Sequence, residues 1–134
     1  MILVDSCVWI DHLRGESTAG TAFLDRMIEQ AQAELCVSGI IVFEVLRGVV
    51  HPAERKSIAG VFNGLERRDY RHGSIDEILR HDLNCRRRGV TLPKLGDWLI
   101  VQTALDHDLE LLTTDRDFRK IAPHVPVRLV PLGG

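Results

Sequence analysis

Short, mainly apolar runs that alternate with helical patterns constrain the fold of this chain more than any other feature. The runs lie at residues 2–4, 35–38, 109–113 and 127–130, and their length and composition predict strands buried on both faces. The alternation predicts an α/β protein in three layers, with a central, mainly parallel sheet between helices. A weak further strand is expected at residues 69–72. Helices are expected at residues 7–13, 21–32, 39–50, 52–68, 74–89, 97–107 and 115–121.

Length and composition favour one globular domain. The chain has 134 residues, of which 45% are hydrophobic and 27% charged, and this predicts a single packed domain over residues 1–134. No apolar run reaches the roughly 18 residues that a membrane span needs, and no basic segment opens the chain. The sequence therefore predicts no signal peptide and no membrane anchor.

Three cysteines stand far apart in the sequence. Cys7, Cys36 and Cys85 form no CxxC pair, and their odd number argues against a disulfide framework or a zinc site. We expect them to be reduced, as thiols usually are in the cytoplasm. Their pattern therefore favours a cytoplasmic protein.

Two helix starts carry residues that predict caps. Ser6 is expected to cap the helix at 7–13. Ser74 and Glu77 have the spacing of a capping box for the helix at 74–89. The buried face of that second helix is expected to comprise Ile75, Ile78, Leu79 and Leu83.

Four acidic residues occupy positions where the pattern calls for apolar or neutral side chains. Asp5 follows a buried strand, and Asp115 follows the run at 109–113. Glu44 lies inside an apolar run, and Asp97 precedes four apolar residues. In an α/β fold these positions can meet at the carboxyl edge of one sheet. Carboxylates gathered there would repel one another or become protonated unless a divalent, oxygen-preferring cation such as Mg²⁺ or Mn²⁺ binds them.

Each acid also has a simpler explanation. Asp5, Asp97 and Asp115 could be ordinary helix N-caps, and Glu44 could pair with Arg47 one turn along its helix. The convergence of all four positions is what favours a metal site.

The four acids lie in segments that resemble the motifs of a known family. The segments are MILVDSCVWIDHL at the start, VFEVLRG around Glu44, KLGDWLIVQTAL around Asp97 and LELLTTDRDF around Asp115. They span almost the whole chain, in the order and spacing of the PIN domain family. Within that family the sequence resembles the VapC-type ribonuclease toxins of toxin–antitoxin systems. The resemblance implies a PIN-like three-layer α/β/α fold.

Residue roles follow from this resemblance. It assigns supporting hydroxyls to Ser6 and Thr113, and Asp117 is expected to support or cap the last motif. Many relatives carry a hydroxyl where this chain has Ile41 and an acid where it has Gly96, so the hydrogen bonding around the site is expected to differ. The catalytic and metal-binding residues that the resemblance implies are Asp5, Asp97, Asp115 and Glu44, the last binding directly or through water.

The resemblance also implies an activity and partners. It implies a Mg²⁺- or Mn²⁺-dependent endoribonuclease that hydrolyses RNA phosphodiester bonds and leaves 5′-phosphate and 3′-hydroxyl ends. It also implies a homodimer that is silenced by a cognate VapB-type antitoxin and does not bind membranes. One alternative is a PIN-like module that binds RNA or protein without cleavage. Another is a receiver-type signalling domain, which needs a lysine after a late strand; Lys56, Lys94 and Lys120 do not follow one.

Arginines near the acidic motifs are candidate RNA contacts. Arg86, Arg87 and Arg88 end the helix at 74–89, and Arg116 adjoins Asp115. Guanidinium groups bind phosphate well, so these residues are predicted to hold the RNA backbone. The alternatives are an interaction with the helix macrodipole for the first three and a surface ion pair for Arg116.

The helices at 7–13 and 39–50 carry more apolar residues than two helix faces on a small sheet need. Some of these residues are expected to form a groove for an antitoxin helix, the alternative being core packing. The candidates are Val8, Trp9, Leu13, Ile41, Val42, Phe43, Leu46, Val49 and Val50.

Overall fold

The structure is a computed structural model that describes residues 1–133. Its strands form one five-stranded sheet in the order β3-β2-β1-β4-β5, and every neighbouring pair is parallel. Ile2 in the central strand lies opposite Leu35 on one side and Glu110 on the other. The predicted α/β class with a parallel sheet is confirmed. The strands are β1 (Ile2–Val4), β2 (Leu35–Val37), β3 (Glu66–Arg67), β4 (Glu110–Leu112) and β5 (Arg128–Leu129).

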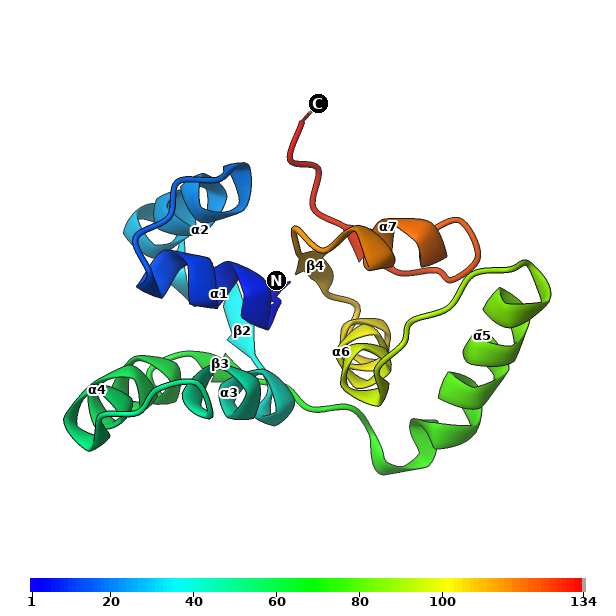
Figure 1. The fold of residues 1–134 in the computed structure, drawn as a ribbon, viewed down its shortest axis with the longest axis horizontal. Helices are drawn as coiled ribbons and strands as arrows, with labels where there is room; N and C mark the ends of the chain where they lie inside the picture. The colour runs from blue at the N-terminus through cyan, green and yellow to red at the C-terminus, as the bar shows by residue number, and fades with distance from the viewer. Residues whose placement is uncertain (134) are drawn as a thin grey trace.

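Helices cover both faces of the sheet. Figure 1 shows α1 and α2 on one side of the strands and α5 and α6 on the other. Short 3₁₀ turns at Gln32–Glu34 and His72–Ser74 lead into β2 and α5. The helices are α1 (Ser6–Leu13), α2 (Ala19–Gln30), α3 (Gly39–Leu46), α4 (Pro52–Asn63), α5 (Ile75–Arg87), α6 (Leu95–Asp106) and α7 (Arg116–Ile121).

The strand order places a topological switch point between β1 and β4. From β1 the chain adds β2 and β3 on one side, and then crosses to add β4 and β5 on the other. Ligands of open parallel sheets bind at the carboxyl ends of the strands where the order reverses. Receiver domains have the order 2-1-3-4-5, so the observed order contradicts that alternative.

The segment after α4 differs from expectation. The predicted helix at 52–68 ends at Asn63, and the predicted strand at 69–72 is absent from its position. The strand forms instead at Glu66–Arg67, because these two residues pair with Cys36 and Val37 of β2. Pairing with a strand thirty residues earlier overrides a helical pattern that local spacing alone cannot distinguish.

α5 also departs from its predicted packing. The Ser74 side chain does not cap the helix but donates a hydrogen bond to Asp106 Oδ2 at 2.7 Å. Glu77 instead accepts one from Gln102 at 2.8 Å. α5 buries Ile78 and Cys85 through one face, so the expected core face is wrong for three of its four members. Those exposed members are Ile75, Leu79 and Leu83, with exposures of 52%, 56% and 42%.

α6 is the most enclosed helix, as its apolar start predicts. Trp98 and all residues from Ile100 to Ala104 are buried, including Gln102, which is only 1% exposed. Gln102 donates to Glu77 and to Asp106, so its amide is satisfied inside the core. The buried residues of α6 anchor this helix in the core, and its first turn carries Asp97.

Candidate metal centre

Asp5 lies buried at the end of the central strand. Its Oδ1 accepts from the Ser6 backbone N–H at 2.8 Å, so Asp5 is the N-cap of α1 and Ser6, predicted to be the cap, is the first helical residue. Its Oδ2 accepts from Thr113 Oγ1 at 2.7 Å and from Cys7 Sγ at 3.2 Å. Burial raises the pKa of Asp5, and these three hydrogen bonds oppose the rise. They stabilise the charged form of a carboxylate that is 3% exposed.

Thr113 joins the carboxyl ends of β1 and β4. Its hydroxyl donates to Asp5 and accepts from the Asp115 backbone N–H at 3.1 Å. Asp115 is the N-cap of α7, and its Oδ1 accepts from the Asp117 backbone N–H at 2.9 Å. The cap explanation therefore holds for Asp5 and Asp115. It does not compete with a metal site, because a carboxylate has lone pairs for both.

Glu44 projects from the middle of α3 toward the start of α6. A Cβ added to Gly96 would lie 3.8 Å from Glu44 Oε2. Glu44 Oε1 is buried and has no hydrogen-bond partner. Burial, and next the charge of Asp5, raise the pKa of Glu44. The Ser6 hydroxyl, Lys94 and Arg47 oppose that rise.

The alternative explanation of Glu44 by an ion pair with Arg47 is wrong. Among residues 1–133 no salt bridge joins them, and the Arg47 guanidinium carbon instead lies 5.4 Å from the centre of the Phe43 ring. Glu44 therefore reaches the site without a neutralising side chain in contact.

Asp97 lies in the first turn of α6, where the charges of the other acids act on its carboxylate. Burial first, and then the charges of Asp5, Asp115 and Glu44, raise the pKa of Asp97 to about 6, against a weaker opposing effect of Lys94. Lys94, not Asp97, is the N-cap residue of α6, so the cap explanation for Asp97 is wrong. The structure thus places Asp97 close enough to the other three predicted site acids for their charges to raise its pKa.

The donor set suits a hard divalent cation. Glu44 has a buried oxygen without a hydrogen-bond partner, and the carboxylates of the site repel one another. A cation that binds oxygen would give that oxygen a partner and would offset the repulsion. Within residues 1–133, no three His, Cys, Asp or Glu side chains already stand in a geometry that could hold one metal ion.

Two contacts around the site could not be predicted from the sequence. Cys7 Sγ lies 3.5 Å from Thr114 Oγ1, so the thiol connects α1 with the segment after β4. A Cβ on Gly20 would come within 2.8 Å of the Thr114 methyl group, which shows how closely α2 approaches that segment. No local pattern signals these contacts, because they join residues about a hundred positions apart.

The predicted RNA-contacting arginines lie in two places. Arg86, Arg87 and Arg88 are exposed at the end of α5, where Arg86 pairs with Asp82 at 3.0 Å. Arg116 is exposed and begins α7 directly after Asp115.

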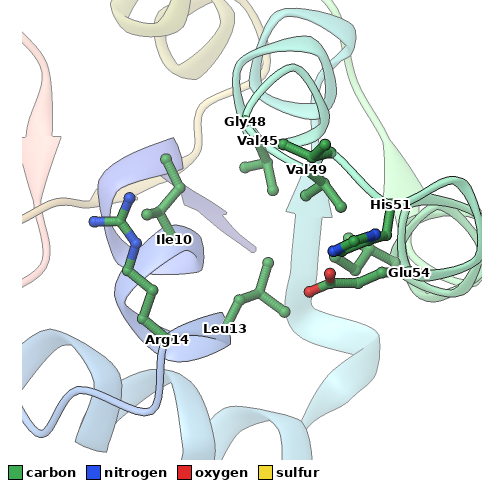
Figure 2. Close-up of a pocket in the computed structure, with 10 residues that line it drawn as sticks. Ile10, Leu13, Arg14, Val45, Gly48, Val49, His51 and Glu54 are labelled. Carbon is green, nitrogen blue, oxygen red and sulfur yellow. The ribbon is translucent and has the colours of Figure 1, made fainter.

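A separate groove lies between α1, α3 and α4. Figure 2 shows Ile10 and Leu13 of α1 facing Val45 and Val49, with His51 and Glu54 closing the other side. The groove has a volume of about 340 Å³. Of the nine apolar candidates, Val8, Trp9 and Ile41 are core residues and cannot line a free surface; the exposed ones are Leu13, Phe43 and Val50.

No helix within residues 1–133 combines the length and apolar character of a membrane span. An all-parallel sheet with carboxylates around its switch point defines an α/β protein with an acidic site at the carboxyl edge. The PIN domain model matches residues 2–123, and the chain belongs to the PIN domain family.

Relatives with similar sequences and solved structures with a similar fold match almost the whole chain. The chain is 26% identical over 128 residues to a VapC ribonuclease of Mycobacterium bovis and to ribonuclease VapC11 of Mycobacterium tuberculosis, covering 91% of this chain and 92% of each relative. It superposes on DNA-bound VapBC from Salmonella typhimurium with a TM-score of 0.76 and 20% identity, covering 98% of both chains. FitAcB from Neisseria gonorrhoeae gives a TM-score of 0.72 at 18% identity, again over 98% of both chains. These similarities confirm the predicted PIN-like fold.

Proposed function

We propose that this chain is a cytoplasmic endoribonuclease that uses Mg²⁺ or Mn²⁺ to hydrolyse RNA. The observation that carries the proposal is the set of carboxylates at the switch point, where burial first, and then the charges of three other acids, raise the pKa of Asp97 to about 6. Membership of the PIN domain family and similarity to VapC ribonucleases support this reading over other uses of an acidic site.

The residues take separate roles in this mechanism. When bound, the cation supplies a water of lowered pKa and polarises a phosphate oxygen. Asp5, Asp97 and Asp115 would hold it, and Glu44 would orient the water that attacks phosphorus. The bond from phosphorus to the 3′ oxygen then breaks, which leaves 3′-hydroxyl and 5′-phosphate ends. Thr113 aligns Asp5 through its 2.7 Å hydrogen bond and opposes the rise that burial causes in the pKa of Asp5.

The test is cleavage of end-labelled RNA with Mn²⁺, with Mn²⁺ plus excess EDTA, and by an Asp97→Asn variant. We expect cleavage only by the wild type with free Mn²⁺. Glu29→Gln, on the exposed face of α2, is the control and should cleave normally. RNA that is bound but never cut would support the non-catalytic alternative and reject the proposed enzyme.

Arg86, Arg87, Arg88 and Arg116 are proposed to contact the RNA backbone. Each phosphate contact to a single strand adds about 0.7 to the slope of log affinity against log salt concentration. Changing Arg86 and Arg88 to Gln should lower that slope by about 1.4 if both bind phosphate. An unchanged slope would restrict them to a structural role at the end of α5.

We further propose that the groove in Figure 2 binds an apolar helix of a VapB-type antitoxin. Leu13 and Val50 are exposed at 44% and 79% on its rim, and solved structures of similar fold include the VapBC complex from Salmonella typhimurium. Leu13→Asp and Val50→Asp should abolish co-purification with the cognate antitoxin. Val61→Asp, at a 54% exposed valine of α4 outside the groove, should not. Co-purification of all three variants would place the antitoxin elsewhere.

The proposed homodimer forms through the exposed stripe of α5. Ile75, Leu79 and Leu83 recur every four residues on one face of the helix. α5 is acidic in its first turn and basic in its last, with Asp76 at one end and Arg87 at the other. An antiparallel pairing of two copies therefore covers the leucines and sets opposite charges together.

A further inference from the structure

A second hollow lies on the other side of α3, and its charge differs from that of the groove in Figure 2. Its apolar floor is formed by Val42 and Leu46 of α3, beside Phe43. Its remaining side chains are the guanidinium groups of Arg47, Arg55 and Arg67, and no acidic residue lines it. Figure 1 shows the three elements involved, α3, α4 and β3, side by side.

Phe43 is an unusually exposed aromatic side chain. It is 60% exposed although it belongs to a helix packed against α1, α4 and α6. The Arg47 guanidinium carbon lies 5.4 Å from the centre of its ring. An exposed ring with an arginine over it offers a nucleic acid base an aromatic surface for stacking and a cation beside that surface.

The three arginines are held in place by hydrogen bonds or ring contact. Arg55 donates to the Val49 carbonyl at 3.0 and 3.2 Å and to the Val50 carbonyl at 3.2 Å. Arg67 donates to Asp69 at 3.1 Å, and this carboxylate neutralises one of the three charges. A hollow that remains cationic after this pairing favours a polyanion over an apolar helix.

The hollow adjoins the proposed metal centre through α3. Phe43 immediately precedes Glu44, and Arg47, one turn further along α3, lies over the Phe43 ring. A strand that crosses the acidic site can therefore continue over Phe43 without leaving this helix.

We infer that the hollow is a subsite for single-stranded RNA, in which one base stacks on Phe43 and Arg47 binds an adjacent phosphate. The inference rests on the proposed RNA-cleaving function and adds where the substrate strand leaves the acidic site. Recognition of this kind tolerates any base, because every base has a flat face.

The experiment measures binding without cleavage. A fluorescein-labelled 2′-O-methyl oligouridine is titrated with wild-type protein and with variants in EDTA, and its anisotropy gives Kd at several salt concentrations. Phe43→Leu keeps an apolar side chain but removes the ring, and Phe43→Tyr restores the ring. Arg47→Gln removes one cation. A second aromatic–arginine pair on α2, Phe23 with Arg26 at 5.6 Å, supplies matched controls in Phe23→Leu and Arg26→Gln.

We expect Phe43→Leu to weaken binding about tenfold with an unchanged salt slope, and Phe43→Tyr to bind like the wild type. Arg47→Gln should reduce the slope by about 0.7. The two control variants should match the wild type. Equal binding by all variants would overturn the inference, and so would loss of antitoxin binding by Phe43→Leu without loss of RNA binding, which would assign the hollow to a protein.

Failure of the proposed function gives a different result. Wild-type protein that binds the oligouridine through Phe43 but does not cut RNA with Mn²⁺ would reject the enzyme and keep the subsite. Wild-type protein that cuts RNA with no dependence on Phe43 would keep the enzyme and reject the subsite. Wild-type protein that does not bind the oligouridine at all would overturn the subsite, whatever its cleavage.

Discussion

The Asp97 carboxylate is ionised at a cost to the folded state. The pKa of this group is about 6 in the folded protein, above its ordinary value of 3.8. A carboxyl with a raised folded pKa costs nothing while it is protonated in both states, below about pH 4. Its cost then grows as pH rises and is complete above about pH 6. In the absence of metal, stability should therefore fall between pH 4 and pH 6 on account of Asp97.

Asp97→Asn should remove this cost. One pKa unit corresponds to about 1.4 kcal/mol, so the upper limit is about 3 kcal/mol, and solvent screening of a half-buried group reduces it to about 1 kcal/mol. Thermal melts in EDTA should show a more stable variant at pH 7 and equal stabilities at pH 3.5. Mg²⁺ should raise the melting temperature of the wild type much more than that of the variant. Equal shifts by Mg²⁺ in both proteins would remove Asp97 from the metal site.

Cys7 supports Asp5 as a hydrogen-bond donor. Burial, and then the charge of Asp5, raise the pKa of the Cys7 thiol to about 11, so it stays protonated and able to donate at neutral pH. Cys7→Ser keeps a donor, whereas Cys7→Val leaves Asp5 Oδ2 with Thr113 alone. A net hydrogen bond contributes about 1 kcal/mol, so Cys7→Val should bind Mn²⁺ about fivefold more weakly in calorimetric titration. Identical affinities for the Ser and Val variants would show that the thiol does not act through Asp5.

At the scale of elements, the contact of α2 with the segment after β4 holds Thr114 in place. Gly20→Ala would set a methyl group 2.8 Å from the Thr114 methyl, so one of the two segments must move. We expect a loss of about 1–2 kcal/mol in unfolding free energy and weaker Mn²⁺ binding, because Thr114 neighbours the Thr113–Asp115 hydrogen bond.

Gly60→Ala is the matched control for this contact. Gly60 is also helical, and a Cβ there meets nothing within 4 Å. It should keep Mn²⁺ affinity and gain about 0.5–1 kcal/mol, since alanine suits a helix better than glycine. Urea denaturation of both variants provides the comparison. A neutral Gly20→Ala variant would mean that α2 gives way freely at this contact.

Elements were predictable where local pattern and tertiary packing agree. β1, with three apolar residues before an aspartate, and α6, with its apolar start, both formed as the sequence predicts. Asp5 and Asp97 stood out because an acid is costly in such surroundings. The buried face of α5 was predicted wrongly, because an apolar stripe at helical spacing has the same sequence pattern whether the core or another molecule covers it. Cys7 and Gly20 act across the fold, so their contacts with Thr114 required the structure.

At the scale of the whole molecule, the exposed stripe on α5 predicts association. Leu79→Glu would place a charge within the proposed contact between two copies, where its desolvation opposes pairing. Light scattering should give twice the mass of one chain for the wild type and a single chain for the variant. Val61→Glu, at a 54% exposed residue of α4, should leave the mass unchanged. A wild type that stays monomeric at high concentration would leave α5 free for another partner.

The pairing of β1 with β4 has a consequence for the order of events during synthesis. Residues 2–4 leave the ribosome more than a hundred residues before their neighbours at 110–112. Until β4 is made, β1 can pair only with β2, and its other edge stays unpaired. Closing the long loop between β1 and β4 is slow. Thr113 cannot meet Asp5 until then, so the acidic site is completed only after residue 113 has been translated. Under the proposed RNA-cleaving function, a chain that is still shorter than this would lack the complete site while its own message is being read.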